Sequence, residues 1–109
     1  MMSKWEVLNS LKVIGVSMSP KTLLNYEIWG LILPPKRTRL GRGRGTLVEY
    51  PDSVVIDVYA IYKTLHGKAM KATVPALILA KRCAEFHPTV RALWMENIKE
   101  AKKKVEEYR

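Results

Sequence analysis

Residues 34–50 read PPKRTRLGRGRGTLVEY. The stretch 36–44 holds five cationic side chains and no acidic one, and glycine alternates with arginine in its second half. Arginine offers a planar fork of donors that matches the oxygens of phosphate, and glycine lets a backbone come close to a groove wall. Beyond the glycines, Thr46, Val48 and Tyr50 alternate with Leu47 and Glu49. This pattern predicts two short strands, residues 36–40 and 46–50, joined by a glycine-rich turn.

The chain opens with a helix signal. Ser3 and Glu6 have the spacing of a capping box, in which each side chain satisfies a free backbone amide at a helix start. We therefore expect a first helix over residues 4–12. Its apolar side chains fall on one stripe: Trp5, Leu8 and Leu11, with Val7 beside them.

A second helix is expected over residues 20–29, because Ser19 stands before Pro20 in the manner of a helix cap. Its apolar side chains should face the core and its polar ones the outside, with Leu23, Leu24 and Ile28 inward and Lys21, Thr22 and Asn25 outward. Two placements stay open for Tyr26: in the core, or with its phenol bonded to a phosphate. Two short helices with a tight turn between them predict a helix-turn-helix.

Three further helices are expected after the hairpin. The first starts at Pro51 and ends at His66-Gly67, the second covers residues 74–86, and the third covers residues 88–108. The last one repeats apolar side chains at spacings of four, three, four and three, which is the heptad rhythm of a helix that buries one seam: Trp94, Ile98, Ala101, Val105 and Tyr108. That seam could pair two copies of the chain or pack back on its own domain.

The expected fold is mostly α with a small β-hairpin. Residues 1–67 are assigned to a winged helix-turn-helix domain, with the hairpin as its wing (residues 36–50). Residues 68–109 are assigned to a helical extension, in which residues 88–108 form a candidate dimerisation helix.

Charge and composition favour a polyanionic partner. The formal net charge is +9, and residues 1–47 carry eight basic side chains against two acidic ones. The most apolar run, residues 74–80, is too short to span a membrane, and a single cysteine, Cys83, favours a reducing cytoplasm. The sequence shows no nucleophile beside a base, no paired carboxylates and no phosphate-binding loop, so neither catalysis, a cofactor nor a metal site is expected.

In residues 6–65 the order of helix, serine-capped helix, Pro-Pro, basic hairpin and helix resembles the DNA-binding domain of the MerR family. The resemblance is carried by Gly15-Val16-Ser17, Ser19-Pro20-Lys21-Thr22-Leu23, Tyr26-Glu27, Gly30-Leu31, Pro34-Pro35-Lys36-Arg37-Thr38 and Tyr50. It implies that residues 20–29 enter the major groove and that the wing grips flanking phosphates or the minor groove. It also implies that a C-terminal helix pairs two subunits over a palindromic site.

We therefore expect a sequence-specific double-stranded DNA-binding protein, a transcriptional regulator of the nucleoid that acts as a homodimer. The candidate DNA-binding residues are Ser19, Lys21, Thr22, Asn25, Tyr26, Lys36, Arg37, Arg39, Arg42 and Arg44. The candidate dimerisation residues are those of the heptad stripe.

Other functions fit the same features. A non-sequence-specific architectural, segregation or excisionase-like protein would use the same wing to coat or bend DNA. A protein-interaction module would dock a partner through the C-terminal helix. Binding of single-stranded RNA ranks lower, because most aromatic side chains are expected at apolar helix positions rather than on a sheet.

Overall fold

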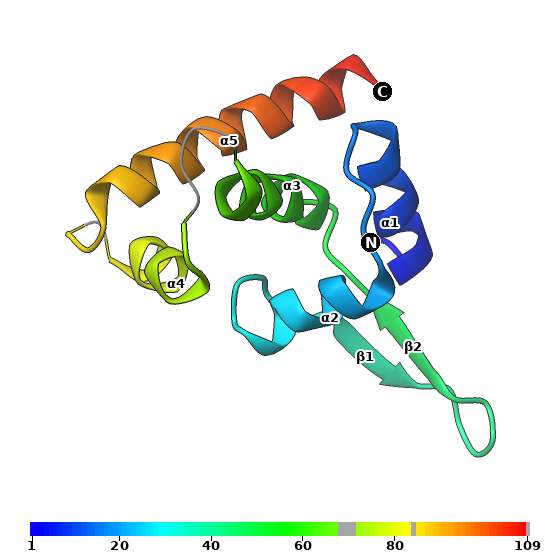
Figure 1. Ribbon diagram of the computed structural model, residues 1–109. Helices are drawn as coiled ribbons and strands as arrows, with labels where there is room; N and C mark the ends of the chain where they lie inside the picture. The colour runs from blue at the N-terminus through cyan, green and yellow to red at the C-terminus, as the bar shows by residue number, and fades with distance from the viewer. Residues whose placement is uncertain (68–71, 84, 109) are drawn as a thin grey trace.

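The computed structural model describes residues 1–67, 72–83 and 85–108. Its elements run in the order α1 (Lys4–Val13), α2 (Pro20–Ile28), β1 (Lys36–Arg39), β2 (Thr46–Glu49), α3 (Val54–His66), α4 (Val74–Arg82) and α5 (Pro88–Glu107) (Figure 1). The chain is therefore mostly helical with a small antiparallel hairpin, as the sequence predicts. Within the described ranges, no helix is long and apolar enough to cross a membrane.

The two predicted serine caps are present. Ser3 Oγ accepts from the amide of Glu6 at 3.2 Å, and Glu6 Oε1 accepts from the amide of Ser3 at 3.2 Å. At the start of α2, Ser19 Oγ accepts from the amide of Thr22 at 3.2 Å, and Pro20 fills the first helical position, where a missing N–H costs nothing. These local contacts explain why the starts of both helices could be predicted.

α3 is the centre of the protein, and every other helix packs side chains against it or its neighbours. The buried cluster includes Val7 and Leu11 from α1, Leu23 and Tyr26 from α2, Val58, Tyr59 and Ile61 from α3, Leu77 from α4 and Ala101 from α5. One hydrophobic core thus extends across residue 67, the expected boundary between the two assigned units.

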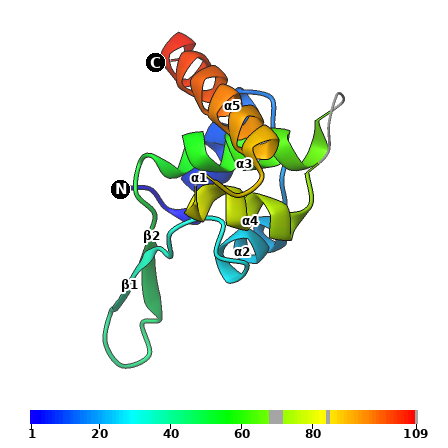
Figure 2. The ribbon, with the colours of Figure 1, turned by 90° about the vertical axis from the view of Figure 1, so that its left-hand side faces the viewer.

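The wing projects from the helical body, and α5 lies at the opposite end of the molecule (Figures 1 and 2). β1 and β2 pair antiparallel, with Arg37 opposite Val48. The amide of Met2 donates to the carbonyl of Tyr50 at 2.8 Å, and the amide of Tyr50 donates to the carbonyl of Met2 at 2.7 Å. The wing is therefore anchored at its base and free at its tip.

The fourth helix is shorter than expected. The sequence predicts a helix over residues 74–86, whereas α4 ends at Arg82. Cys83 is extended, with φ −142° and ψ 126°. Arg91 Nη1 of α5 donates to the carbonyl of Ala80 at 2.6 Å. A helix leaves its last carbonyls without intrahelical partners, and this donor from the following helix satisfies one of them.

α5 packs along α3 through both apolar and polar contacts. Ala101 is fully buried, and Trp94 and Val105 pack on the core from partly buried positions. Asn97 Nδ2 donates to Thr64 Oγ1 at 3.0 Å across the same interface. The stripe therefore packs largely on its own domain, which is one of the two arrangements compatible with the sequence pattern.

Candidate nucleic-acid interface

The turn of the wing explains the alternation of glycine and arginine. Gly41, Gly43 and Gly45 have φ of 102°, 77° and 79°, a left-handed backbone that side chains with a Cβ rarely adopt. The amide of Arg44 donates to the carbonyl of Gly41 at 3.2 Å and closes the turn. Arg42 and Arg44 are therefore held between glycines at the tip, where both are exposed.

Every residue from Lys36 to Leu47 is exposed, so all five predicted cations of the wing reach solvent. No acidic side chain occurs between Glu27 and Glu49. An open hollow of about 450 Å³ at the tip brings Arg39 and Arg42 together beside the turn. This concentration of cations on a projecting hairpin favours contact with a phosphate backbone.

One of the five cations is already paired within the described part of the chain. Arg37 Nη2 donates to Glu27 Oε1 of α2 at 2.7 Å. The pair also affects the pKa of the nearby Tyr50. Burial is the main cause that raises this pKa, Glu27 raises it further, and Arg37 acts in the opposite direction. Arg37 therefore lies at the wing's base, whereas Arg39, Arg42 and Arg44 extend beyond it.

A hollow of about 340 Å³ lies between α2 and the base of the wing. Its lining combines three cations, one carboxylate and apolar side chains: Lys4, Lys21, Arg37, Glu27, Pro20, Leu24, Val48 and Tyr50. No sequence pattern predicts that Lys4 belongs to this face, because it precedes the hollow's other residues by a whole helix. Because residues of both elements line this hollow, α2 and the base of the wing are neighbours on one surface.

The predicted faces of α2 are partly wrong. Leu23 is buried as expected, but Leu24 and Ile28 are 45% and 68% exposed. Leu23 and Tyr26 are three residues apart and share the inner face, and helical periodicity then turns Leu24 and Ile28 outward. The outer stripe of α2 is therefore Lys21, Leu24 and Ile28.

Tyr26 packs in the core, which is one of the two placements that the sequence leaves open, and its role in DNA binding stays a prediction. It is 2% exposed, and its hydroxyl is buried with no hydrogen-bond partner among the described residues. Burial, with a smaller effect of Tyr62, raises its pKa to about 12. In this arrangement the phenol hydroxyl is buried in the core.

The other candidate residues of α2 differ in accessibility. Lys21 and Ser19 are exposed, although the Ser19 hydroxyl is occupied as the helix cap and lies 3.1 Å from Thr22 Oγ1. Thr22 and Asn25 are half-buried instead of fully outward, and they line a hollow toward the end of α3 with Trp29 and other side chains. Among the three side chains of this helix predicted to face base edges, Lys21 is thus the most accessible.

The five candidate dimerisation residues are not equally available to a second copy. Ala101 is fully buried, Trp94, Ile98 and Val105 are partly buried, and Tyr108 is exposed. The structure therefore leaves no continuous five-residue seam on the outside of α5. Dimerisation through this stripe, and the homodimer itself, stay predictions.

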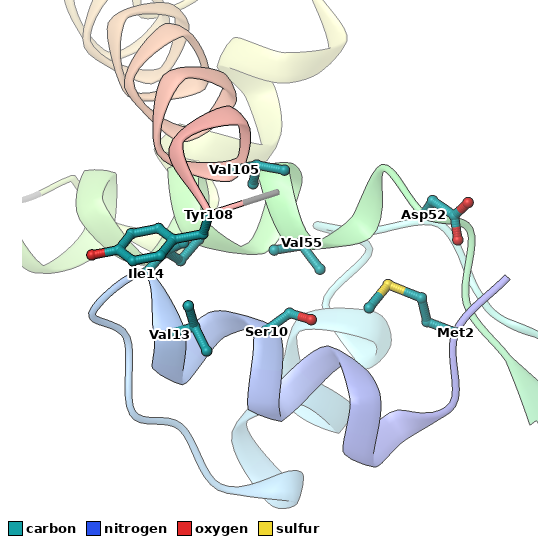
Figure 3. A pocket seen from close by; sticks show the side chains of 8 residues that line it. All are labelled: Met2, Ser10, Val13, Ile14, Asp52, Val55, Val105 and Tyr108. Atoms are coloured by element: carbon teal, nitrogen blue, oxygen red, sulfur yellow. The ribbon is translucent and has the colours of Figure 1, made fainter.

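The end of α5 lies beside another hollow (Figure 3). It measures about 320 Å³ and is lined mainly by apolar side chains from α1, α3 and α5, with Tyr108 at one side. Asp52 is its one acidic residue. In the ranges the structure describes, no group of three or more His, Cys, Asp or Glu side chains could hold a metal ion.

Sequence reasoning missed the contacts of Lys81, which lies on α4 close to α5 and to the loop after α2. Lys81 Nζ donates to the carbonyl of Leu31, just after α2, and lies 5.4 Å from the ring centroid of Trp94. Burial lowers the pKa of Lys81, and burial raises the pKa of nearby Asp57. No sequence signal could have found this contact, because a lysine near a helix end usually faces water. The contact fixes the loop after α2 against α4.

Comparisons of the chain with models of protein families, with curated proteins and with solved structures found no match.

Proposed function

We propose that the protein binds double-stranded DNA as a MerR-like winged helix-turn-helix protein, and that it regulates transcription. α2 would lie in the major groove, and the wing would lie on the phosphate backbone or in the minor groove. The observation that carries the proposal is the wing, whose five exposed cations sit on a projecting hairpin without an acid in its turn. Phosphate contacts of this kind supply nearly all of the affinity in non-specific DNA binding and a large share of it in specific binding.

The position of α2 supports a joint interface. The Arg37–Glu27 pair ties β1 to α2, and the hollow beside it is lined by both elements. The exposed Lys21 lies on the same face as this hollow. A protein with this arrangement would use the wing to set its register on the backbone and the helix to contact base edges.

The half-buried positions of Thr22 and Asn25 favour a second candidate function. They reduce the number of hydrogen-bonding groups that α2 offers to base edges. An architectural or excisionase-like protein needs few such groups, because it gains affinity from the backbone and from DNA deformation.

Selection of bound duplexes from a random DNA library at ~150 mM salt separates the two candidates, since non-specific phosphate binding is weak there. Enrichment of a motif supports a sequence-reading regulator, and an inverted repeat would also support a homodimer. Retention without an enriched motif supports the architectural function. Failure to retain any duplex, at this salt and at lower salt, would reject DNA binding.

A further inference from the structure

The outer stripe of α2 carries two apolar side chains, Leu24 and Ile28, where a groove-reading helix commonly carries hydrogen-bonding groups. Leu24 and Ile28 are four residues apart, so their side chains are neighbours on the helix surface. They are 45% and 68% exposed, and Lys21 continues the stripe one turn earlier. Exposed leucine and isoleucine side by side cost solvation free energy unless something covers them.

We propose that this stripe contacts thymine methyl groups in the major groove, so that the protein prefers targets rich in A·T pairs. The inference rests on the proposed DNA-binding function and names the specificity-determining residues of that same interface. Leu24 and Ile28 supply the discrimination, and Lys21 holds a neighbouring phosphate.

The chemistry of the major groove points to thymine. Leucine and isoleucine have no hydrogen-bonding groups, so they cannot read the donors and acceptors of a base edge. The C5-methyl of thymine is the apolar group that the four standard base pairs display in the major groove. Against a G·C pair the same side chains would cover the cytosine amino group and guanine acceptors without replacing their hydrogen bonds to water, which is unfavourable.

The charges around the stripe decide between DNA and an uncharged apolar partner. Lys4, Lys21 and Arg37 line the hollow beside Leu24, and the single carboxylate there, Glu27, is paired with Arg37. Three further arginines of the wing continue this cationic surface. An apolar stripe set among cations is complementary to a polyanion that displays methyl groups, which describes an A·T-rich duplex.

The test removes the methyl group from the DNA and leaves the protein unchanged. A duplex of alternating A and T is compared with the same duplex in which deoxyuridine replaces thymidine, so charge and base-pairing groups stay the same. Affinity at ~150 mM salt is measured by fluorescence anisotropy. We expect the uridine duplex to bind about fourfold more weakly for each thymine methyl group that the stripe covers. Methylation of cytosine at C5 in a G·C duplex should raise its affinity.

Leu24→Ala should show a smaller preference for the thymidine duplex over the uridine duplex than the unchanged protein does. Leu79→Ala is the matched control, because Leu79 is 41% exposed on α4 and lies outside the stripe and the hollow. It should keep the full preference for thymidine. Thermal unfolding checks that both variants are folded.

Equal affinity of the unchanged protein for the thymidine and uridine duplexes would overturn the inference. So would a Leu24→Ala variant that still prefers thymidine as strongly as the unchanged protein. In both cases salt-dependent binding of duplexes would leave the proposed function standing. Absence of binding to every duplex, at ~150 mM salt and below, would overturn both, and an acidic protein partner would then be the better occupant of this face.

Discussion

Arg37 of β1 donates a 2.7 Å hydrogen bond to Glu27 of α2 and so joins the base of the wing to the neighbouring helix. The side chain of Glu27 is only 12% exposed, and its second oxygen, Oε2, is buried with no hydrogen-bond partner in the described ranges. Arg37 is therefore the group that compensates a largely buried carboxylate. The pair therefore links β1 directly to α2.

Replacing Arg37 should destabilise the protein more than replacing Arg39, the next residue on the same face of β1. Arg37→Ala leaves the Glu27 carboxylate unpaired, so we expect the free energy of unfolding to fall by about 1 kcal/mol, a value kept low because Arg37 is half-exposed. Arg39→Ala should change it by less than about 0.5 kcal/mol. Urea denaturation measures both. Equal losses would show that the pair does not hold the wing to α2.

Tyr26→Phe should leave DNA binding unchanged and should not lower stability at neutral pH. The hydroxyl it removes is buried and lacks a partner among the described residues. Removing such a group is expected to raise the free energy of unfolding by up to about 1 kcal/mol. Anisotropy and urea denaturation give the two readouts. A clear loss of affinity for duplex DNA, with stability intact, would restore Tyr26 as a phosphate ligand.

The same variant should change the response to alkaline pH. Burial raises the pKa of Tyr26 from 10.0 to about 12, so its neutral form is favoured in the folded state. The stability that this shift of the Tyr26 pKa contributes is fully present below pH 10 and is lost as the pH rises through about 12. Tyr26→Phe should therefore lose less stability over this window than the unchanged protein, as measured by urea denaturation at each pH. Part of the loss should persist in the variant, because the pKa of Tyr59 is also raised to about 12.

The buried polar contact between α3 and α5 should behave as a coupled pair. Thr64 Oγ1 accepts from Asn97 Nδ2 at 3.0 Å and donates to the carbonyl of Ala60 at 2.7 Å. Thr64→Val leaves the Asn97 amide buried without that partner, at a cost of about 1–3 kcal/mol. The double variant Thr64→Val with Asn97→Leu should cost less than the two single changes together. Additive losses in a double-mutant cycle would show that the hydrogen bond contributes nothing.

Local signals in the sequence are sufficient to predict the element order. The Ser3–Glu6 and Ser19–Pro20 caps act within one helical turn, and glycines at positive φ in the wing mark its turn. Each of these features depends on neighbouring residues only. The coarse fold, mostly helical with a small hairpin, follows from them.

The choice of which helix face is buried depends on tertiary packing, and there the sequence is insufficient. On α2, Leu23 with Tyr26 and Leu24 with Ile28 are both acceptable apolar stripes by periodicity. Packing in the common hydrophobic core selects the first pair. On α5, the heptad pattern does not include Asn97, which is buried because Thr64 supplies a partner that no local pattern reveals. At the end of α4, the carbonyl of Ala80 accepts from Arg91 of α5, another contact that no local pattern reveals.

The salt dependence of DNA binding tests the role of the wing most directly. Arg42→Ala with Arg44→Ala removes two cations from its tip, and Lys102→Ala with Lys103→Ala removes two exposed cations from α5, at the opposite end of the molecule (Figure 1). If the wing grips phosphates, the wing variant should lower the slope of log affinity against log salt concentration by about 2, and the α5 variant should leave it unchanged. An unchanged slope in the wing variant would contradict DNA binding through the wing.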